Sequence, residues 1–308
     1  MSTLPTAPLQ EETLPAAPAP LRRFVRDFRA SKVALAGAVA LVILILAALF
    51  APLIAPQNPY DLAQIDILDS RLDPGQAASH GGMTYVLGTD EQGRDMLSAI
   101  LYGLRISLLV GFGSTAIALS LGLVLGLLAG YFRGLVDAVI MRVADIQLSF
   151  PPILVALILL ALSGPGIDKI LFALVAVQWA YYARTARSAA LVERGKEYIE
   201  AARGLGLSPW RIVFRHLLPN CMPPLIVIAA LQVASAISLE ATLSFLGLGM
   251  PITEPSLGLL IANGFDYLLS GKYWISVFPG LVLLLTVVAI NLVADQLRDV
   301  LNPRLQTQ

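Results

Sequence analysis

The most distinctive spacing of small and charged side chains lies in the polar stretch 184–220. Its marked positions are Glu200, Ala201, Ala202, Gly206, Ser208, Arg211, Leu218 and Pro219. These residue types are better suited to a contact with another protein than to catalysis. Adjacent alanines keep a surface low, and glycine permits a sharp reversal of the chain. The stretch therefore predicts a docking element with a compact bend.

The turn and capping residues of this stretch predict two short helices. Residues 193–205 favour a helix, and the glycines in 204–206 supply its C-terminal stop. Ser208 can cap a second helix with Pro209 in its first position, and Pro219 is expected to block its continuation. A bent helical pair of this kind could serve as a lever.

A second group of candidate residues lies in an apolar run and consists of Glu240, Ser238 and Ser235. An ionisable group in such a run usually faces an interior or a cavity, because exposure to lipid is costly. Glu240 could therefore contact a solute on a translocation pathway. It could equally be a structural carboxylate near the outer interface, paired with a helix terminus or with a cation of a partner subunit. Both readings stay open.

Several kinds of chemistry are not expected of this chain. It contains no Gly-x-x-x-x-Gly-Lys-Ser/Thr phosphate loop. Cys221 is the only cysteine, and with only His80 and His216 beside it no metal site is expected. The formal net charge is +0, so no basic footprint indicates nucleic acid. We expect neither a bound cofactor nor a metal.

The composition is typical of a membrane protein. The 308 residues are 57% hydrophobic and 14% charged, with a mean hydropathy of +0.76. Soluble domains are about 45 to 50% apolar and about 25% charged. Apolar runs with few or no charges predict an all-α polytopic membrane protein with about six transmembrane helices. The runs are 33–54, 106–130, 136–162, 171–183, 224–248 and 274–293.

Lysine and arginine accumulate in alternate loops, and this asymmetry predicts the orientation because these residues resist translocation. The basic loops are the N-terminal tail, the turn at 131–134 and the stretch 184–216, which are assigned to the cytoplasm together with both termini. The predicted regions are a cytoplasmic tail (1–32), a first transmembrane helix (33–56), an extracytoplasmic segment (57–103), a core (104–300) and a cytoplasmic tail (301–308). The first 20 residues are expected to be flexible.

Four glycines spaced by four lie in or beside the second apolar run: Gly122, Gly126, Gly130 and Gly134. This spacing places them on one face of a helix, where another backbone can approach closely. The second span is therefore predicted to be buried and tightly packed.

The polar stretch resembles the coupling-loop signature of permease subunits in bacterial ABC importers. The resemblance rests on Glu-Ala-Ala at 200–202, a glycine six positions after the glutamate at Gly206, and Leu-Pro at 218–219. In that family the loop docks into a groove on the ATPase subunit, and the first four of these residues occupy docking positions. His216 stands where the broad consensus has isoleucine, and the peptide and nickel branch commonly carries histidine there.

Other segments resemble the dipeptide, oligopeptide and nickel uptake branch of this family. They are 87–95 and 102–107 before the second span, 243–249 and 255–258 in a later outer segment, and 297–299 and 302–304 near the C-terminus. One position departs, since the family often has tryptophan where Leu257 stands. The matches extend from about residue 34 to residue 304.

The resemblance implies a type I ABC importer permease fold, with 184–220 as its coupling loop. It also implies partners: a second homologous permease subunit, two ATP-binding-cassette ATPase subunits that hold ATP and Mg, and an extracytoplasmic solute-binding protein. The implied function is alternating-access import of short peptides, or a related small solute, across the bacterial inner membrane. The chain itself is then not an enzyme, because ATP is hydrolysed on the partner chains.

The outer segment is the second expected contact with these partners. It is acidic between residues 61 and 95 and contains Asp90, Glu91, Arg94 and Asp95. It is too long and too polar to be a mere turn, so we expect it to contact the binding protein or the second permease. The alternative is a loose, disordered loop.

Two other classes of function compete with the importer. An ion-driven secondary carrier or channel acting alone would be expected to show intramembrane charges in discontinuous helices or paired repeats. It would have no use for the polar stretch 184–220. A membrane scaffold without transport activity would need neither the glycine-lined span nor Glu240.

Overall fold

The computed structural model describes residues 20–61, 63–80 and 82–301, and within this part the predicted all-α fold is confirmed. The predicted flexible tail before residue 20 and the C-terminal residues 302–308 lie outside the described residues. The helices are α1 (Pro20–Ala30), α2 (Lys32–Leu49), α3 (Ala51–Ile54), α4 (Met96–Phe132), α5 (Gly134–Leu148), α6 (Pro152–Ser163), α7 (Ile167–Arg194), α8 (Glu197–Gly204), α9 (Pro209–Ile212), α10 (Leu218–Phe245), α11 (Leu257–Phe265) and α12 (Trp274–Leu301).

Four helices of the described residues are long and apolar enough to cross a membrane: α2, α4, the continuous helix Pro209–Phe245, and α12. The pair α5 and α6 meets the same criteria when taken together, which makes five. The remaining predicted run, 171–183, lies inside α7, whose 28 residues extend over about 42 Å. The count of about six spans thus roughly agrees with the helices observed.

The third predicted span is not one straight helix. α5 and α6 are bent by 89° at the break between Leu148 and Pro152. Two consecutive prolines, Pro151 and Pro152, explain the break, because neither has an N–H to donate and the residue before a proline disfavours the helical conformation. Gln147 lies beside the bend and accepts a hydrogen bond of 2.5 Å from the Trp179 indole of α7.

The predicted close helix packing is found between α4 and α7, which make the most extensive contact in the fold. A Cβ added to Gly126 would lie 2.4 Å from the Ala183 carbonyl oxygen and 2.6 Å from the Cβ of Ala186. Gly122 and Gly130 meet α7 in the same way. Gly134 differs from the prediction, because α4 ends at Phe132 and Gly134, with φ +58, begins α5.

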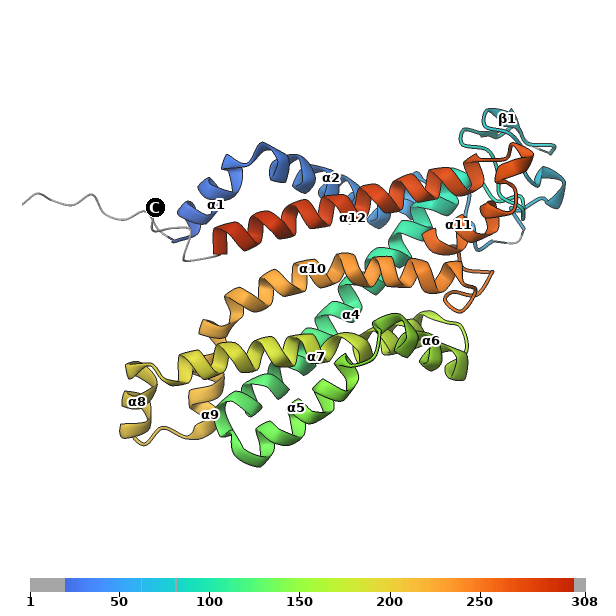
Figure 1. Ribbon diagram of the computed structural model, residues 1–308. Helices are drawn as coiled ribbons and strands as arrows, with labels where there is room; N and C mark the ends of the chain where they lie inside the picture. The colour runs from blue at the N-terminus through green and yellow to red at the C-terminus, as the bar shows by residue number, and fades with distance from the viewer. Residues whose placement is uncertain (1–19, 62, 81, 302–308) are drawn as a thin grey trace, which may run out of the picture.

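Elements from far apart in the sequence meet at the two ends of the helix bundle (Figure 1). One end carries α8, α9, α1 and the C-terminal end of α12. The other end carries α11 and the outer segment with its short hairpin, formed by β1 (Gln76–Ala77) and β2 (Thr84–Tyr85). The loops rich in lysine and arginine are therefore separated from the acidic outer segment by the length of the bundle.

Candidate functional site

The stretch 184–220 forms an elbow of two short helices, α8 and α9, beyond the end of α7. Gly206 lies at the bend with φ +71, a left-handed conformation that is cheap only for glycine. Its N–H donates to the Arg203 carbonyl (2.9 Å), and the N–H of Leu207 donates to the Ala202 carbonyl (3.2 Å). These two bonds are the Schellman pattern that ends a helix. The Ser208 hydroxyl then caps α9 by accepting from the Arg211 N–H at 3.4 Å.

Two predicted helix boundaries in this region are wrong. The first short helix begins at Glu197 and not at residue 193, because α7 runs on to Arg194 and ends at Gly195. Pro219 does not stop the second helix. A π-helical segment, Val213–Leu217, lets the Leu218 N–H donate to the Val213 carbonyl, and α10 follows directly. Pro219 is tolerated because it sits in the first turn of α10.

The elbow presents most of the predicted docking residues at its surface. Glu200, Ala201, Gly206, Ser208, Arg211 and Pro219 are exposed, and Leu218 is half-buried. Ala202 differs because it is buried, 4% exposed, in a cluster with Ile199 and Ile212. A residue in that position cannot touch another protein directly, so its contribution is to hold α8 against α9.

Sequence reasoning missed two exposed apolar side chains at the elbow, Leu205 and Trp210. The Leu205 side chain is 80% exposed beside Gly206, and Trp210 on α9 is 56% exposed. The Trp210 ring packs against the rings of Phe132 and Phe214, each with centroids 6.0 Å away. The sequence did contain a signal for Leu205: it stands between the two glycines of a predicted turn, and a side chain at the tip of a turn is rarely buried.

The buried face of the elbow is continuous with the membrane helices. Ile199 and Ala202 of α8 belong to one apolar cluster with Leu127 of α4, Ala190 of α7 and Cys221 of α10. Because protein interiors are close-packed, a displacement of α8 is transmitted to three long helices rather than absorbed locally.

Glu240 is sealed inside the helix bundle with 0% exposure. Its carboxylate accepts hydrogen bonds from the hydroxyls of Ser107 on α4 (3.0 Å) and Ser244 on α10 (2.8 Å). Ser256, the N-cap of α11, also interacts with this carboxylate. The carboxylate thus faces three serines, one of them at the start of α11, and no cation of the described residues pairs with it.

Ser235 and Ser238 are not brought together with Glu240. Both serines are exposed on another face of α10. Ser238 lines a groove of about 430 Å³ between α10, α11 and α12, together with Thr242 and apolar side chains. The residues predicted as one pathway group therefore separate into a buried carboxylate, a serine that lines the groove (Ser238) and an exposed serine outside it (Ser235).

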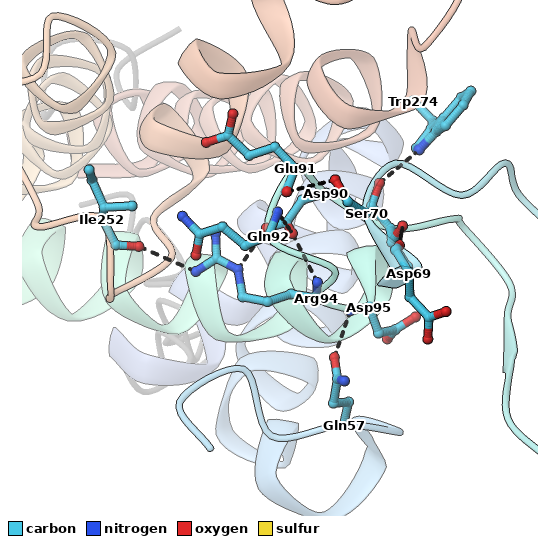
Figure 2. Close-up of polar contacts among 11 residues, drawn as sticks. Gln57, Asp69, Ser70, Asp90, Glu91, Gln92, Arg94, Asp95, Ile252 and Trp274 are labelled. Carbon is cyan, nitrogen blue, oxygen red and sulfur yellow. Dashed lines mark hydrogen bonds and ion pairs between the residues drawn. The ribbon is translucent and has the colours of Figure 1, made fainter. Parts of the chain in front are cut away.

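The outer segment is an ordered frame rather than a loose loop, and an ion pair lies at its centre (Figure 2). The Arg94 Nε donates to the Asp90 carboxylate at 2.6 Å, and both side chains are at most 1% exposed. The other Asp90 oxygen accepts from the backbone N–H groups of Gln92 and Arg94, each at 2.9 Å. Arg94 also reaches the Ile252 carbonyl (3.4 Å) in the loop before α11.

Asp95 ends the outer segment and begins α4. Its carboxylate accepts from both the backbone N–H (2.7 Å) and the hydroxyl (2.6 Å) of Ser98. Because of this cap, α4 starts at Met96, so the last residues of the predicted outer segment, 96–103, form the first two turns of this helix. Burial raises the pKa of the Asp95 carboxyl, despite these hydrogen bonds.

Asp69 is the buried carboxylate of the hairpin region. It accepts hydrogen bonds from the Ser79 N–H (2.8 Å) and the Tyr85 hydroxyl (2.8 Å). Burial alone would raise the pKa of Asp69, but the hydrogen bonds from Ser79 and Tyr85 outweigh it, so the net pKa is lowered. A charged Asp69 therefore fixes the hairpin onto the rest of the segment.

Burial corrects the prediction that Asp90, Arg94 and Asp95 touch a partner. These three side chains are at most 1% exposed, so they have no surface for another protein to contact. Glu91 is half-buried and is the only member of the predicted set with exposed surface. Two contacts hold the frame against α12 and the loop before it. Lys272 of the loop pairs with Asp73 at 2.8 Å, and the indole of Trp274, the first residue of α12, donates to the Thr89 carbonyl at 3.1 Å.

Replacing Arg94 with methionine is expected to loosen this frame, because it leaves the Asp90 carboxylate buried without its cation. Breaking a buried pair from one side costs about 3 to 5 kcal/mol, whereas removing both charges costs much less. Limited proteolysis in detergent should cut Arg94→Met within residues 57–95 far faster than the wild type, and Asp90→Asn/Arg94→Met should recover part of the resistance. Equal cutting rates for Arg94→Met and the wild type would contradict this role.

No group of three or more His, Cys, Asp or Glu side chains in residues 20–61, 63–80 and 82–301 is arranged to hold a metal ion.

Comparison with known proteins identifies relatives that match nearly the whole chain. Residues 122–307 match the model of the binding-protein-dependent transport system inner membrane component family. Residues 19–74 match the N-terminal TM domain of oligopeptide transport permease C. The di/tripeptide transport system permease protein DppC of Pseudomonas aeruginosa is 40% identical over 99% of both chains. The dipeptide transport system permease protein DppC of Escherichia coli is 43% identical over 93% of this chain and 94% of the relative.

Among solved structures, the fold is similar to a chain of the MetNI methionine ABC transporter in inward-facing conformations. The TM-score is 0.55 at 21% identity, and the match covers 67% of this chain and 98% of that one. The part shared with the methionine transporter is thus about two thirds of this chain. At this identity the likeness concerns the fold.

Proposed function

This chain belongs to the family of binding-protein-dependent transport system inner membrane components, and from that premise we propose that it imports short peptides as one permease subunit of an ABC transporter. It is a multi-pass membrane protein and a permease, not an enzyme, since the ATPase is a separate subunit in this family. Di- and tripeptides are the proposed solutes because they are named for relatives that match over nearly the full length.

The α8–α9 elbow is the observation that carries the proposal. It combines a fixed bend at Gly206, an exposed Leu205 and a buried face joined to α4, α7 and α10. Such an element suits a lever: one side is free for another protein, and the other side moves with the membrane helices. We propose that the ATPase subunits grip it, so that ATP binding and hydrolysis drive alternating access.

The proposed assembly contains a second homologous permease, two ATPase subunits and an extracytoplasmic solute-binding protein. ATP and Mg are bound by the ATPase subunits. The elbow and both termini are placed in the cytoplasm and the outer segment outside, which the lysine and arginine distribution supports. The membrane is proposed to be the bacterial inner membrane.

Within this assembly, we propose that the solute route runs along the side of α10 that carries the exposed Ser235 and the groove lined by Ser238. Glu240 is assigned a structural role, because three serines surround it and it has no exposed surface. In the outer segment, Glu91 and the exposed rim are proposed to meet the binding protein or the second permease.

Uptake of a labelled dipeptide by the complete complex in proteoliposomes tests this function. We expect uptake to require ATP on the ATPase side and the binding protein on the other, and to continue when ionophores collapse all ion gradients. An ion-driven carrier would instead need an ion gradient and would work without ATP or the binding protein. Peptide uptake by this chain alone, driven by a gradient and indifferent to ATP, would overturn the proposal.

A further inference from the structure

Helix α1 and the first turns of α2 carry a concentration of positive charge that the proposed transport cycle does not use. Residues 20–32 contain four arginines and Lys32 against a single acidic residue, Asp27. Arg26, Arg29 and Lys32 are exposed. Neither Arg29 nor Lys32 forms an ion pair with any residue in the described part of the chain.

The same helix has an apolar side that attaches it to the bundle. Phe24 and Phe28 are four residues apart, half-buried, and stacked with ring centroids 6.3 Å apart. Arg26 lies on the opposite side of the helix from both rings, and Arg29 lies between that side and Phe28. The Gln296 side chain of α12 donates to the Asp27 carbonyl at 3.1 Å, which fixes α1 against the end of α12.

Ser31 turns the chain between α1 and α2. Its extended backbone (φ −89, ψ 108) breaks the helix, and its hydroxyl caps α2 by accepting from the Ala34 N–H at 3.2 Å. Figure 1 shows α1 and α2 meeting at an angle above α12 rather than forming one straight rod. Since α2 is a membrane span, α1 must lie at the polar boundary of the bilayer.

A shallow apolar groove begins at this boundary. It has a volume of about 440 Å³ and is lined by Leu35, Ala36, Val39, Ala40 and Ile43, with Lys32 at its polar end. All of these residues lie on one face of α2, where the two alanines leave space between larger side chains. A cation at the head of an apolar groove matches a molecule with an anionic head and a hydrocarbon chain.

We propose that this surface binds an anionic phospholipid, with its headgroup phosphate at Arg26, Arg29 and Lys32 and one acyl chain along the groove of α2. Clusters of basic residues on an amphipathic helix beside a membrane span attract anionic lipids by about 1 kcal/mol per charge. A bound lipid would extend the contact that Gln296 makes and hold α1 between the bilayer surface and α12. A soluble protein is a poorer match, because the groove lies on a span that the hydrocarbon surrounds.

Native mass spectrometry of the full-length chain can test this lipid site. The chain is purified with a mixture of phosphatidylglycerol and phosphatidylcholine, and retained lipids are counted. We expect selective retention of phosphatidylglycerol, weakened about fivefold by Arg29→Gln and on the order of a hundredfold by Arg26→Gln/Arg29→Gln/Lys32→Gln. Arg142→Gln, which removes an exposed charge from α5, is the matched control and should change nothing.

Two further variants separate charge from shape. Arg26→Lys/Arg29→Lys keeps the charge and should keep phosphatidylglycerol, whereas Ala40→Phe fills the groove and should reduce retention with all charges present. The proposal is overturned if phosphatidylcholine is retained equally, or if the triple variant loses no more lipid than Arg142→Gln. Displacement of the lipid by millimolar inorganic phosphate would also overturn it, since that result identifies a site for free anions.

Discussion

Alanine at position 126 is expected to destabilise the permease strongly, although alanine is the best helix former. Its methyl group would lie 2.4 Å from the Ala183 carbonyl oxygen and 2.6 Å from the Ala186 Cβ. Neither neighbour is a flexible side-chain end, so α4 and α7 must move apart. Overpacking a tight core costs about 1 to 3 kcal/mol, and Gly122→Ala adds a second clash on the same face. The double variant is therefore expected to lose most of its folded protein.

Gly113→Ala on the same helix is the matched control. The nearest atom to its added Cβ is the Leu171 Cδ2 at 3.4 Å, an ordinary contact with a flexible side chain. There the gain in helix propensity, about 1 kcal/mol, should make the variant as stable as the wild type or more so. Thermal unfolding in detergent measures both effects. If Gly126→Ala unfolds at the same temperature as Gly113→Ala, the close packing of α4 on α7 is refuted.

Valine at position 206 is expected to leave the membrane bundle intact and stop transport. No atom lies within 4 Å of a Cβ added there, so the cost is conformational: φ is +71, where a β-branched residue is strained. A left-handed non-glycine residue costs roughly 1 to 2 kcal/mol, which raises the population of other elbow conformations about five- to thirtyfold. The variant should insert and pair with the second permease, yet retain less ATPase and take up little peptide.

Gly204→Val is the control for this experiment. Its Cβ also has nothing within 4 Å, but its backbone is not left-handed, so ATPase retention should stay near the wild-type level. Glu200→Lys reverses an exposed charge on the elbow and should weaken ATPase binding by about fivefold or less, because exposed ion pairs contribute only about 0 to 1 kcal/mol. Normal uptake and full ATPase retention in Gly206→Val would remove the main reason for assigning the elbow its role.

The elbow was predictable because its shape is encoded locally. Gly206 ends α8 and Ser208 begins α9, and both effects act within one turn of the chain. The same local reasoning failed at Pro219, since the π-helical segment before it depends on how Val213 and Leu217 are buried against other helices. The consecutive prolines Pro151 and Pro152 also signalled the break between α5 and α6. The bend was missed because the apolar run continues on both sides of them and was interpreted as one span.

Burial of polar side chains was the least predictable feature. Asp90, Arg94 and Asp95 look like surface charges in the sequence, and only the folded frame shows them enclosed. Their partners, Gln57 and Ile252, lie up to 158 residues away along the chain, and no local rule pairs residues at that distance. Glu240 was singled out correctly as unusual, but its three serine neighbours come from α4, α10 and the start of α11.

Site-specific crosslinking from Leu205 tests most directly whether the elbow receives the ATPase. A photoreactive residue is placed at Leu205, and at Ala77 in the hairpin at the opposite end of the bundle, in the intact membrane complex. Both positions are exposed. Leu205 is predicted to capture an ATPase subunit and Ala77 none. Capture of the ATPase from Ala77, or none from Leu205 in a complex that still contains the ATPase, would contradict the account.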